Sequence, residues 1–352
     1  MKFRNRAFAV LLAAALCIPT AGCSGGDKSW AVKTSSSASV PIGAYVYNLY
    51  SAYGQADSKK ADSSKDLFSQ KIENKDAKTW IREKALTYTK QLLLLDQKMK
   101  SMNLTLTDAE KKNASQMNSE VWSQYSSTLE KYGIAQSSFE MAYGTAYAKE
   151  QVIFNNIYGP KGSKAVSDAE LKTYYTKNYT AFSYITCQLY NTDSSGSYAA
   201  MTDAEKKKAK AEFDGYVSQI KSGTMTMEKA ASAYQLSQKS SDNQLYSESI
   251  NLATDTSYPT AMKTALKAMK PGEVKAIELT DAQRYMIVEK EDAGKTAESK
   301  ISSESSRESL LLAYKSSDFL TELNKEADAM TGVTMNDKAI NSYDPKMFVS
   351  AS

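Results

Sequence analysis

Few side chains in this sequence could do covalent or acid–base chemistry. Cys187 is a single thiol inside an aromatic and β-branched segment, where it could be a reactive group in a groove or, as is more frequent, a small core residue. Glu289, Glu291 and Asp292 bring three carboxylates close together, a pattern compatible with general acid–base catalysis. They follow a strand-like segment into a linker, so we interpret them as a solvated edge.

The composition excludes much enzyme chemistry. The chain has no histidine, so Ser-His-Asp, Cys-His and His-Glu-x-x-His arrangements cannot be built. Its three cysteines, Cys17, Cys23 and Cys187, are too few and too scattered for a zinc cluster or a disulfide framework. The sequence therefore predicts no metal and no cofactor.

The charge balance argues against nucleic acid as a partner. The 352 residues carry 44 basic and 40 acidic side chains, and the first 22 residues contribute Lys2, Arg4 and Arg6 without any acid, which leaves 41 against 40. The run from Lys206 to Lys208 could contact an anionic membrane or wall polymer. A solvated helix start is the more frequent role of such a run.

The N-terminus has the features of a secretory signal. A basic segment up to Arg6 precedes the apolar stretch 7–18, and Thr20-Ala21-Gly22-Cys23 then places small residues before a cysteine. This tetrapeptide resembles the bacterial lipobox, although leucine is commoner than Thr20 at its first position. The alternative is an ordinary signal peptide with a chance cysteine. The resemblance implies a signal peptide over 1–22 and lipidation at Cys23, with a flexible tether over 23–39.

The next part of the chain predicts helices. Apolar residues recur every three or four positions from Trp80 to Met102, which indicates a helix packed on other helices. Two capping boxes, Thr107-Asp108-Ala109-Glu110 and Ser167-Asp168-Ala169-Glu170, each open a further helix. The sequence thus predicts a helical domain over residues 40–180. The run Leu92 to Leu95 is too short to cross a membrane.

The period changes at Phe182. Residues 182–190 have the content of a strand, and Thr202-Asp203-Ala204-Glu205 is a third capping box. Residues 270–290 read as a hairpin whose strands flank the polar tip Asp281-Ala282-Gln283. We expect a compact α+β domain over 181–292. A helical pattern returns within 293–352 and should pack on the first helices, which makes the α+β domain an insertion in a mainly helical domain.

The order of elements in residues 181–292 resembles a parvulin-type peptidyl-prolyl isomerase domain. The segments that carry the likeness are Phe213 to Gly223, Met227 to Tyr234, Lys270-Pro271-Gly272-Glu273-Val274, and Arg284 to Val288. Together with the lipobox and the flanking helices, the whole chain is similar to the PrsA and SurA type of extracytoplasmic foldases. That resemblance implies a helical chaperone domain outside the cytoplasmic membrane, anchored to its outer face.

The sequence departs from the parvulin pattern at its signature positions. The two family histidines correspond to Tyr184 and Met286, and the Gly-Gly-Asp-Leu-Gly loop is replaced by Asp242-Asn243-Gln244-Leu245-Tyr246. We therefore expect a domain without isomerase activity. An active isomerase remains the alternative, because isomerisation breaks no covalent bond and a shaped apolar pocket, with Cys187 at its floor, could favour the twisted amide.

The resemblance implies unfolded or partly folded secreted proteins as partners, together with a membrane contacted through the lipid anchor. The 23 tyrosines and 14 methionines suit a surface that adapts to varied apolar partners, although most should lie in the core. The candidates for client binding are Tyr45, Tyr53, Tyr143 and Tyr147. A second alternative is a surface lipoprotein of binding or structural type. A homodimer is compatible with the architecture, but no residue identifies its interface.

Overall fold

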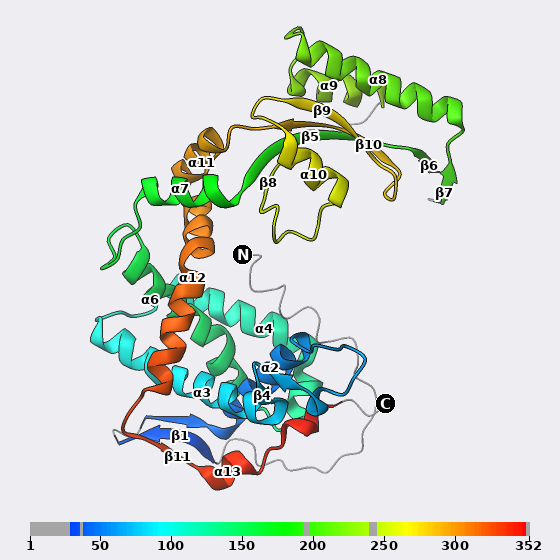
Figure 1. Cartoon of the computed structure of the whole chain (residues 1–352). Coiled ribbons are helices and arrows are strands. Elements are labelled where there is room, and N and C mark those ends of the chain that lie inside the picture. Colours follow the sequence, from blue (N-terminus) through cyan, green and yellow to red (C-terminus); the bar gives the residue numbers. More distant parts are fainter. Residues whose placement is uncertain (1–28, 36–37, 193–196, 239–244, 350–352) are drawn as a thin grey trace. The chain divides into compact units, whose positions relative to one another are not determined.

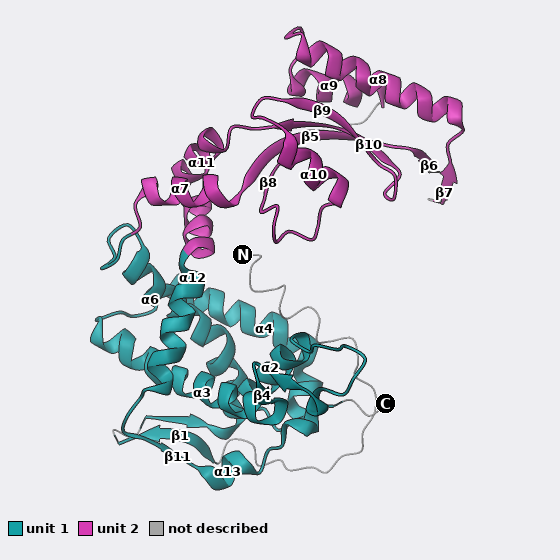
Figure 2. Ribbon diagram, viewed as in Figure 1, with its two compact units in different colours: residues 1–165, 315–352 teal, residues 166–314 magenta. Residues whose placement is uncertain are grey.

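The computed structural model describes residues 29–35, 38–192, 197–238 and 245–349. The protein is an α+β chain in which helices predominate and the sheets are small and antiparallel (Figure 1). It divides into two compact units (Figure 2): residues 1–165 with 315–352, called here the helical unit, and residues 166–314, the sheet unit. Cys23 and the predicted signal peptide lie outside the described residues.

The elements of the helical unit come from both parts of the chain. They are β1 (Trp30–Thr34), β2 (Ser39–Pro41), α2 (Ile42–Ser58), the 3-10 turn η1 (Leu67–Ser69), β3 (Lys71–Ile72), β4 (Lys75–Asp76), α3 (Ala77–Ser101), α4 (Asp108–Lys131), α5 (Gln136–Glu140), the π-helical turn η2 (Met141–Thr145), α6 (Ala146–Tyr158), the part of α12 (Glu304–Asp328) from residue 315, β11 (Val333–Met335), α13 (Asp337–Asn341) and the 3-10 turn η3 (Pro345–Phe348).

The predicted capping boxes begin their helices as expected. At the start of α4, the Thr107 hydroxyl accepts from the Glu110 N–H at 3.2 Å, and the Glu110 carboxylate accepts from the Thr107 N–H at 2.7 Å. The same reciprocal pair opens two helices of the sheet unit. Gly133 follows the C-cap of α4 with a φ of 77°, the left-handed conformation that glycine adopts without strain.

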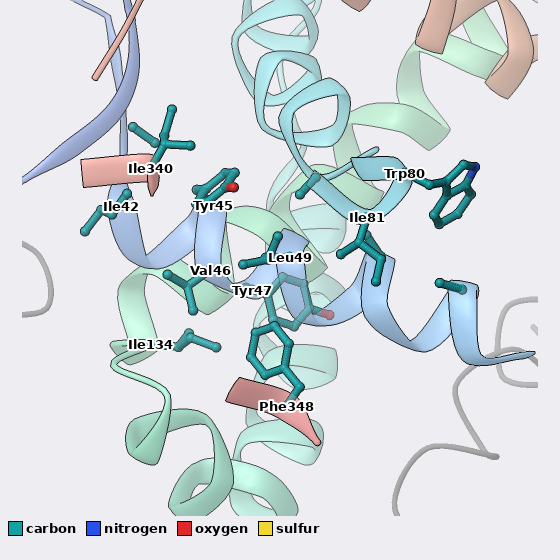
Figure 3. Packing of buried hydrophobic residues seen from close by; sticks show 14 of the residues in the cluster. Ile42, Tyr45, Val46, Tyr47, Leu49, Trp80, Ile81, Ile134, Ile340 and Phe348 are labelled. Carbon is teal, nitrogen blue, oxygen red and sulfur yellow. The ribbon is translucent and has the colours of Figure 1, made fainter. Parts of the chain in front are cut away.

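The core of the helical unit joins residues that are far apart in sequence. Tyr45, Leu49 and Ile81 from α2 and α3 are fully buried, and they share one cluster with Ile340 and Phe348 from the C-terminal segment (Figure 3). Two polar contacts fix that segment: Arg82 donates to the Tyr343 carbonyl at 3.0 Å, and Lys78 pairs with Asp344 at 2.7 Å. The C-terminal residues after 315 are therefore an integral part of this unit.

A small sheet with strand order β11-β1-β2 corrects the expected tether over residues 23–39. Residues 30–34 form a strand rather than a flexible linker, because Ala31 and Val32 are fully buried and β1 pairs with β11. Ser24-Gly25-Gly26 and the serines between 35 and 39 predict a tether, but the short apolar segment Trp30 to Val32 between them forms the strand.

The sheet unit contains α7 (Asp168–Asn178), β5 (Thr180–Gln188), β6 (Tyr190–Thr192), β7 (Tyr198–Ala200), α8 (Asp203–Lys221), α9 (Met227–Ser237), β8 (Tyr246–Ile250), α10 (Thr260–Ala268), β9 (Val274–Leu279), β10 (Arg284–Lys290), α11 (Ala293–Ser302) and the part of α12 before residue 315. The main sheet has the order β8-β5-β10-β9, and every pairing is antiparallel. The predicted hairpin is β9 and β10, and Gln283 at its tip has a φ of 48°.

The two faces of this sheet have separate cores. Helices α8 and α9 cover one face through Phe213, Val217 and Ala230, whereas α10 covers the other through Met262 and Leu266 (Figure 1). Because successive side chains of a strand point to opposite faces, the register of β5 and β10 decides which core each residue joins.

The boundaries of the sheet unit differ from the expected 181–292. Helices α7 and α11 pack against each other, and the Tyr175 hydroxyl lies 2.6 Å from the Ser249 hydroxyl at the edge of the main sheet. Arg307 also donates to Asp168 at 2.9 Å and to the Val166 carbonyl. These contacts place residues 166–180 and 293–314 with the sheet. None of the described helices is both long and apolar enough to span a lipid bilayer.

Candidate functional site

The structure brings Tyr184 and Met286, the positions that the sequence resemblance assigns to the family histidines, onto one face of the sheet. In the antiparallel register of β5 and β10, Tyr184 pairs with Val288 and Thr186 pairs with Met286. Tyr184 and Met286 are therefore diagonal neighbours, two positions apart on adjacent strands, and both contact the core under α10. The hairpin places Met286 at the centre of this face, where its side chain is 3% exposed.

Aromatic rings surround these two positions. The Tyr184 ring stacks on Tyr246 with centroids 5.1 Å apart, and it lies 5.9 Å from Phe182. Phe182 in turn meets Tyr258 edge to face at 5.6 Å. We call Phe182, Tyr184, Tyr246 and Tyr258, together with Met286, the aromatic face. Tyr246 is 42% exposed, so this face reaches solvent along the edge strand β8.

Two phenols of the aromatic face, those of Tyr184 and Tyr258, stay protonated at neutral pH. Burial raises the pKa of Tyr184, and the nearby Glu248 carboxylate raises it further, while a hydrogen bond from Tyr258 acts in the opposite direction. Burial also raises the pKa of Tyr258, which donates that hydrogen bond. The face can stack against an apolar ring, and its phenol hydroxyls can donate hydrogen bonds. Its five side chains include no histidine, carboxylic acid or thiol, the usual groups of general acid–base catalysis.

Cys187 lies on the opposite face of the sheet. It is buried under α8 and α9 beside Phe213 and Tyr234, so it does not form the floor of a groove with Tyr184 and Met286. The expectation that Cys187 forms the floor of the active-site groove is therefore wrong. Residues 184 and 187 are an odd number of positions apart, and side chains of a strand alternate between the two faces of a sheet. Burial raises the pKa of the Cys187 thiol to about 11.

We expect Cys187 to be inert in the folded protein. In a chain that begins at Ser24 it is the only cysteine, and at pH 8 a thiol of pKa about 11 is almost entirely protonated. Titration with a disulfide reagent such as DTNB should detect essentially no thiol within minutes in the native state and one thiol per chain in guanidinium. Rapid native reaction would instead place Cys187 at an accessible surface.

The charged residues singled out in the sequence have structural roles. Asp292 is the N-cap of α11 and accepts from the Gly294 N–H at 2.7 Å, and its backbone hydrogen bonds lower its pKa. Glu291 accepts from the Thr296 hydroxyl at 3.1 Å, and burial raises the pKa of Glu289. The lysines 206–208 lie in the first turns of α8, with the last two exposed to solvent.

Of the four tyrosines predicted to bind clients, Tyr45 is ruled out by its burial. Tyr45 is fully buried in the core of the helical unit and cannot contact a partner at the surface. Tyr53 and Tyr143 are half-buried and pack against that core, Tyr53 with its ring 5.7 Å from Phe348. Tyr147 is half-buried on α6. The helical spacing of these tyrosines predicts that they pack against other helices, but spacing alone does not show which of them reach solvent.

A pocket in the helical unit was not predicted. It has a volume of about 400 Å³ and is formed by β2, α3, α5, η2 and α6. Its lining residues are Ala38, Ser39, Val40, Leu92, Leu93, Leu95, Asp96, Ser137, Glu140, Met141, Thr145, Ala146 and Lys149. The sequence signal was the run Leu92 to Leu95, because consecutive leucines surround a helix with apolar side chains on every side.

The comparisons with known proteins give fold neighbours among the foldases. The structure is similar to the foldase protein PrsA from Streptococcus pneumoniae, with 14% identity and a TM-score of 0.39 over 74% of this chain and 88% of that one. It is also similar to PrsA from Bacillus subtilis, with 18% identity and a TM-score of 0.27 over 78% and 92%. No family model and no curated protein matches the sequence.

These likenesses carry no functional argument at such low scores. Two groups of residues in this chain bear on its function: the aromatic face of the sheet unit and the pocket of the helical unit.

Proposed function

We propose that this protein is an extracytoplasmic folding factor that holds unfolded or partly folded secreted proteins, with a parvulin-like domain that lacks isomerase activity. One observation carries the second half of the proposal. Tyr184 and Met286, which match the family histidines, lie on one face of neighbouring strands inside an apolar aromatic layer. Neither a methionine nor a buried phenol can replace the proton exchange of a histidine near pH 7, which supports a domain without isomerase activity.

The chemistry of this face favours binding over catalysis. Met286 offers neither a charge nor a hydrogen-bond donor, and the Tyr184 hydroxyl already accepts a hydrogen bond from Tyr258. Aromatic and methionine side chains adapt to differently shaped apolar partners, which a chaperone requires. The partly exposed Tyr246 gives such a partner access to the layer.

The proposal includes the location and the partners implied by the sequence. The lipidated Cys23 would hold the mature chain on the outer face of the cytoplasmic membrane, where secreted proteins emerge unfolded. Its clients are such proteins, and neither nucleic acid nor a cofactor takes part. A homodimer is compatible with this function.

Two other functions make different predictions. An active prolyl isomerase would use the same aromatic face, with the Tyr184 hydroxyl as the polar group at one of the two signature positions. Cys187 has no part in it because it lies on the other side of the sheet. A binding or structural lipoprotein would be indifferent to unfolded clients.

The soluble chain from Ser24 tests these functions in two parallel assays. We expect it to suppress the aggregation of reduced, unfolded lysozyme and not to accelerate isomerisation of a prolyl tetrapeptide. The Tyr246→Ala variant should suppress aggregation less well, whereas Tyr198→Ala, which truncates a tyrosine 78% exposed on β7, should act like the parent chain.

Isomerisation that disappears in Tyr184→Phe would support the enzyme instead, because this change removes only the hydroxyl and keeps the ring. Silence of the parent chain in both assays would favour the binding lipoprotein.

A further inference from the structure

The pocket of the helical unit has an apolar wall and a charged mouth. Leu92, Leu93 and Leu95 of α3 form the wall, each at most 7% exposed, and the buried Ala146 of α6 joins them. The charged residues of the lining are Asp96, Glu140 and Lys149, and Lys149 forms an ion pair with Asp96. The volume of about 400 Å³ lies in the range of ligand pockets, about 300–1,000 Å³.

A π-helical turn shapes one side of this pocket. Turn η2 (Met141–Thr145) interrupts the helix between α5 and α6, and its first and last residues line the pocket. The turn is held from behind by Asn118, which is 4% exposed and whose side-chain oxygen accepts from the Gly144 N–H at 2.9 Å. Such turns cost helix stability and frequently occur at functional sites. The hydrogen bond from Gly144 to Asn118 therefore stabilises the π-helical turn beside the pocket.

The opposite side of the pocket is the edge strand of a sheet. Ala38, Ser39 and Val40 line it, and the sheet of described strands ends at β2. An edge strand can accept a further extended segment through its backbone groups, while an adjacent pocket selects the side chains of that segment. An apolar pocket beside an edge strand suits an extended peptide better than a compact small molecule.

The charges of the mouth indicate which peptide fits. Asp96 and Glu140 together carry two negative charges, and Lys149 carries one positive charge, so the mouth is negative by one. A basic residue next to the inserted side chain would meet this charge favourably, and an acidic residue would be repelled.

We propose that this pocket receives one large apolar side chain of an extended segment that carries Lys or Arg beside it, with the backbone of the segment along β2. The inference rests on the proposed function, since it names the client segment that the helical unit selects. It assigns client recognition to Leu92, Leu93, Leu95 and Ala146 rather than to the tyrosines of the same unit.

A labelled peptide tests the pocket directly. The probe is the fluorescein-labelled peptide Gly-Ser-Lys-Leu-Phe-Lys-Ser-Gly, and its binding to the chain from Ser24 is followed by fluorescence anisotropy. Ala146→Leu narrows the pocket and should weaken binding about tenfold or more, since the apolar side chain of the peptide can then no longer be fully buried. Ala109→Leu adds the same group at an exposed position of α4 and should leave binding unchanged.

The charge of the probe tests the mouth. Replacing both lysines of the peptide by aspartate should weaken binding, and Glu140→Lys should reverse this preference. Glu130→Lys is the matched control, because it makes the same charge change at an exposed site of α4. An equal effect of the two variants would show general attraction between charges and would contradict a site at the mouth.

The outcomes separate this inference from the proposed function. Suppression of lysozyme aggregation by the parent chain, combined with unchanged peptide binding in a folded Ala146→Leu variant, overturns the pocket and leaves the chaperone proposal standing. Loss of peptide binding in this variant, combined with a parent chain that does not suppress aggregation, supports a peptide-binding pocket and removes the chaperone. Unchanged far-ultraviolet circular dichroism and Tm show that the variant is folded.

Discussion

Replacing Gly144 by alanine is expected to destabilise the helical unit by about 3 kcal/mol, because the site has no room for a methyl group. A Cβ atom there would lie 2.4 Å from the Asn118 side-chain oxygen and 2.7 Å from the Ala114 carbonyl oxygen. The backbone carbonyl cannot turn away, so α4 must separate from η2. The hydrogen bond from the Gly144 N–H to Asn118 would weaken at the same time.

Urea unfolding followed by tryptophan fluorescence measures this change selectively. The three tryptophans of the chain, at positions 30, 80 and 122, all belong to the helical unit. Gly215→Ala is the matched control, since no atom lies within 4 Å of the new methyl group in α8. It should stabilise the sheet unit by up to about 1 kcal/mol, measured by circular dichroism. A Gly144→Ala variant as stable as the parent would show that α4 and η2 separate without cost.

Truncating Phe348 to alanine should destabilise the same unit by about 3–5 kcal/mol, the cost of removing a buried phenylalanine. Its side chain is 4% exposed, and its ring centroid lies 4.9 Å from Tyr132, 5.2 Å from Tyr50 and 5.7 Å from Tyr53. The cavity would open between α2, α4 and the C-terminal turn, and the three tyrosine rings cannot fill it from their helices.

Val349→Ala provides the comparison for this change. Val349 is the next residue, is 40% exposed and should lose less than about 0.5 kcal/mol. Both variants are measured by urea unfolding with tryptophan fluorescence. Equal small losses in the two variants would mean that the C-terminal segment is not required for the core.

Local signals in the sequence predicted much of the fold. Each capping box began a helix because it satisfies two backbone donors within four residues, without help from distant parts of the chain. The β9 and β10 hairpin was equally local, since its strands are joined by a short polar tip. The alternation of side chains along β5 also predicts that Cys187 and Tyr184 lie on opposite faces of the sheet.

Features that depend on distant partners were not predicted. Strand β8, with the sequence Tyr-Ser-Glu-Ser-Ile, has too little apolar content to indicate a strand, and it forms because β5 offers an edge. Strand β11 likewise exists through its pairing with β1. The pocket depends on η2, and no spacing in the sequence distinguishes a π-helical turn from the helix around it.

The division of the helical unit between two distant segments sets an order of events during synthesis. The sheet unit is one continuous stretch, 166–314, and its contacts can form once that stretch is available. Residues 42–139 must wait about 200 residues longer for Ile340 and Phe348. A nascent chain therefore exposes apolar surface on its first helices until residues 340–348 are synthesised. During that time it is itself a partly folded chain that is prone to aggregation, like the clients proposed for it.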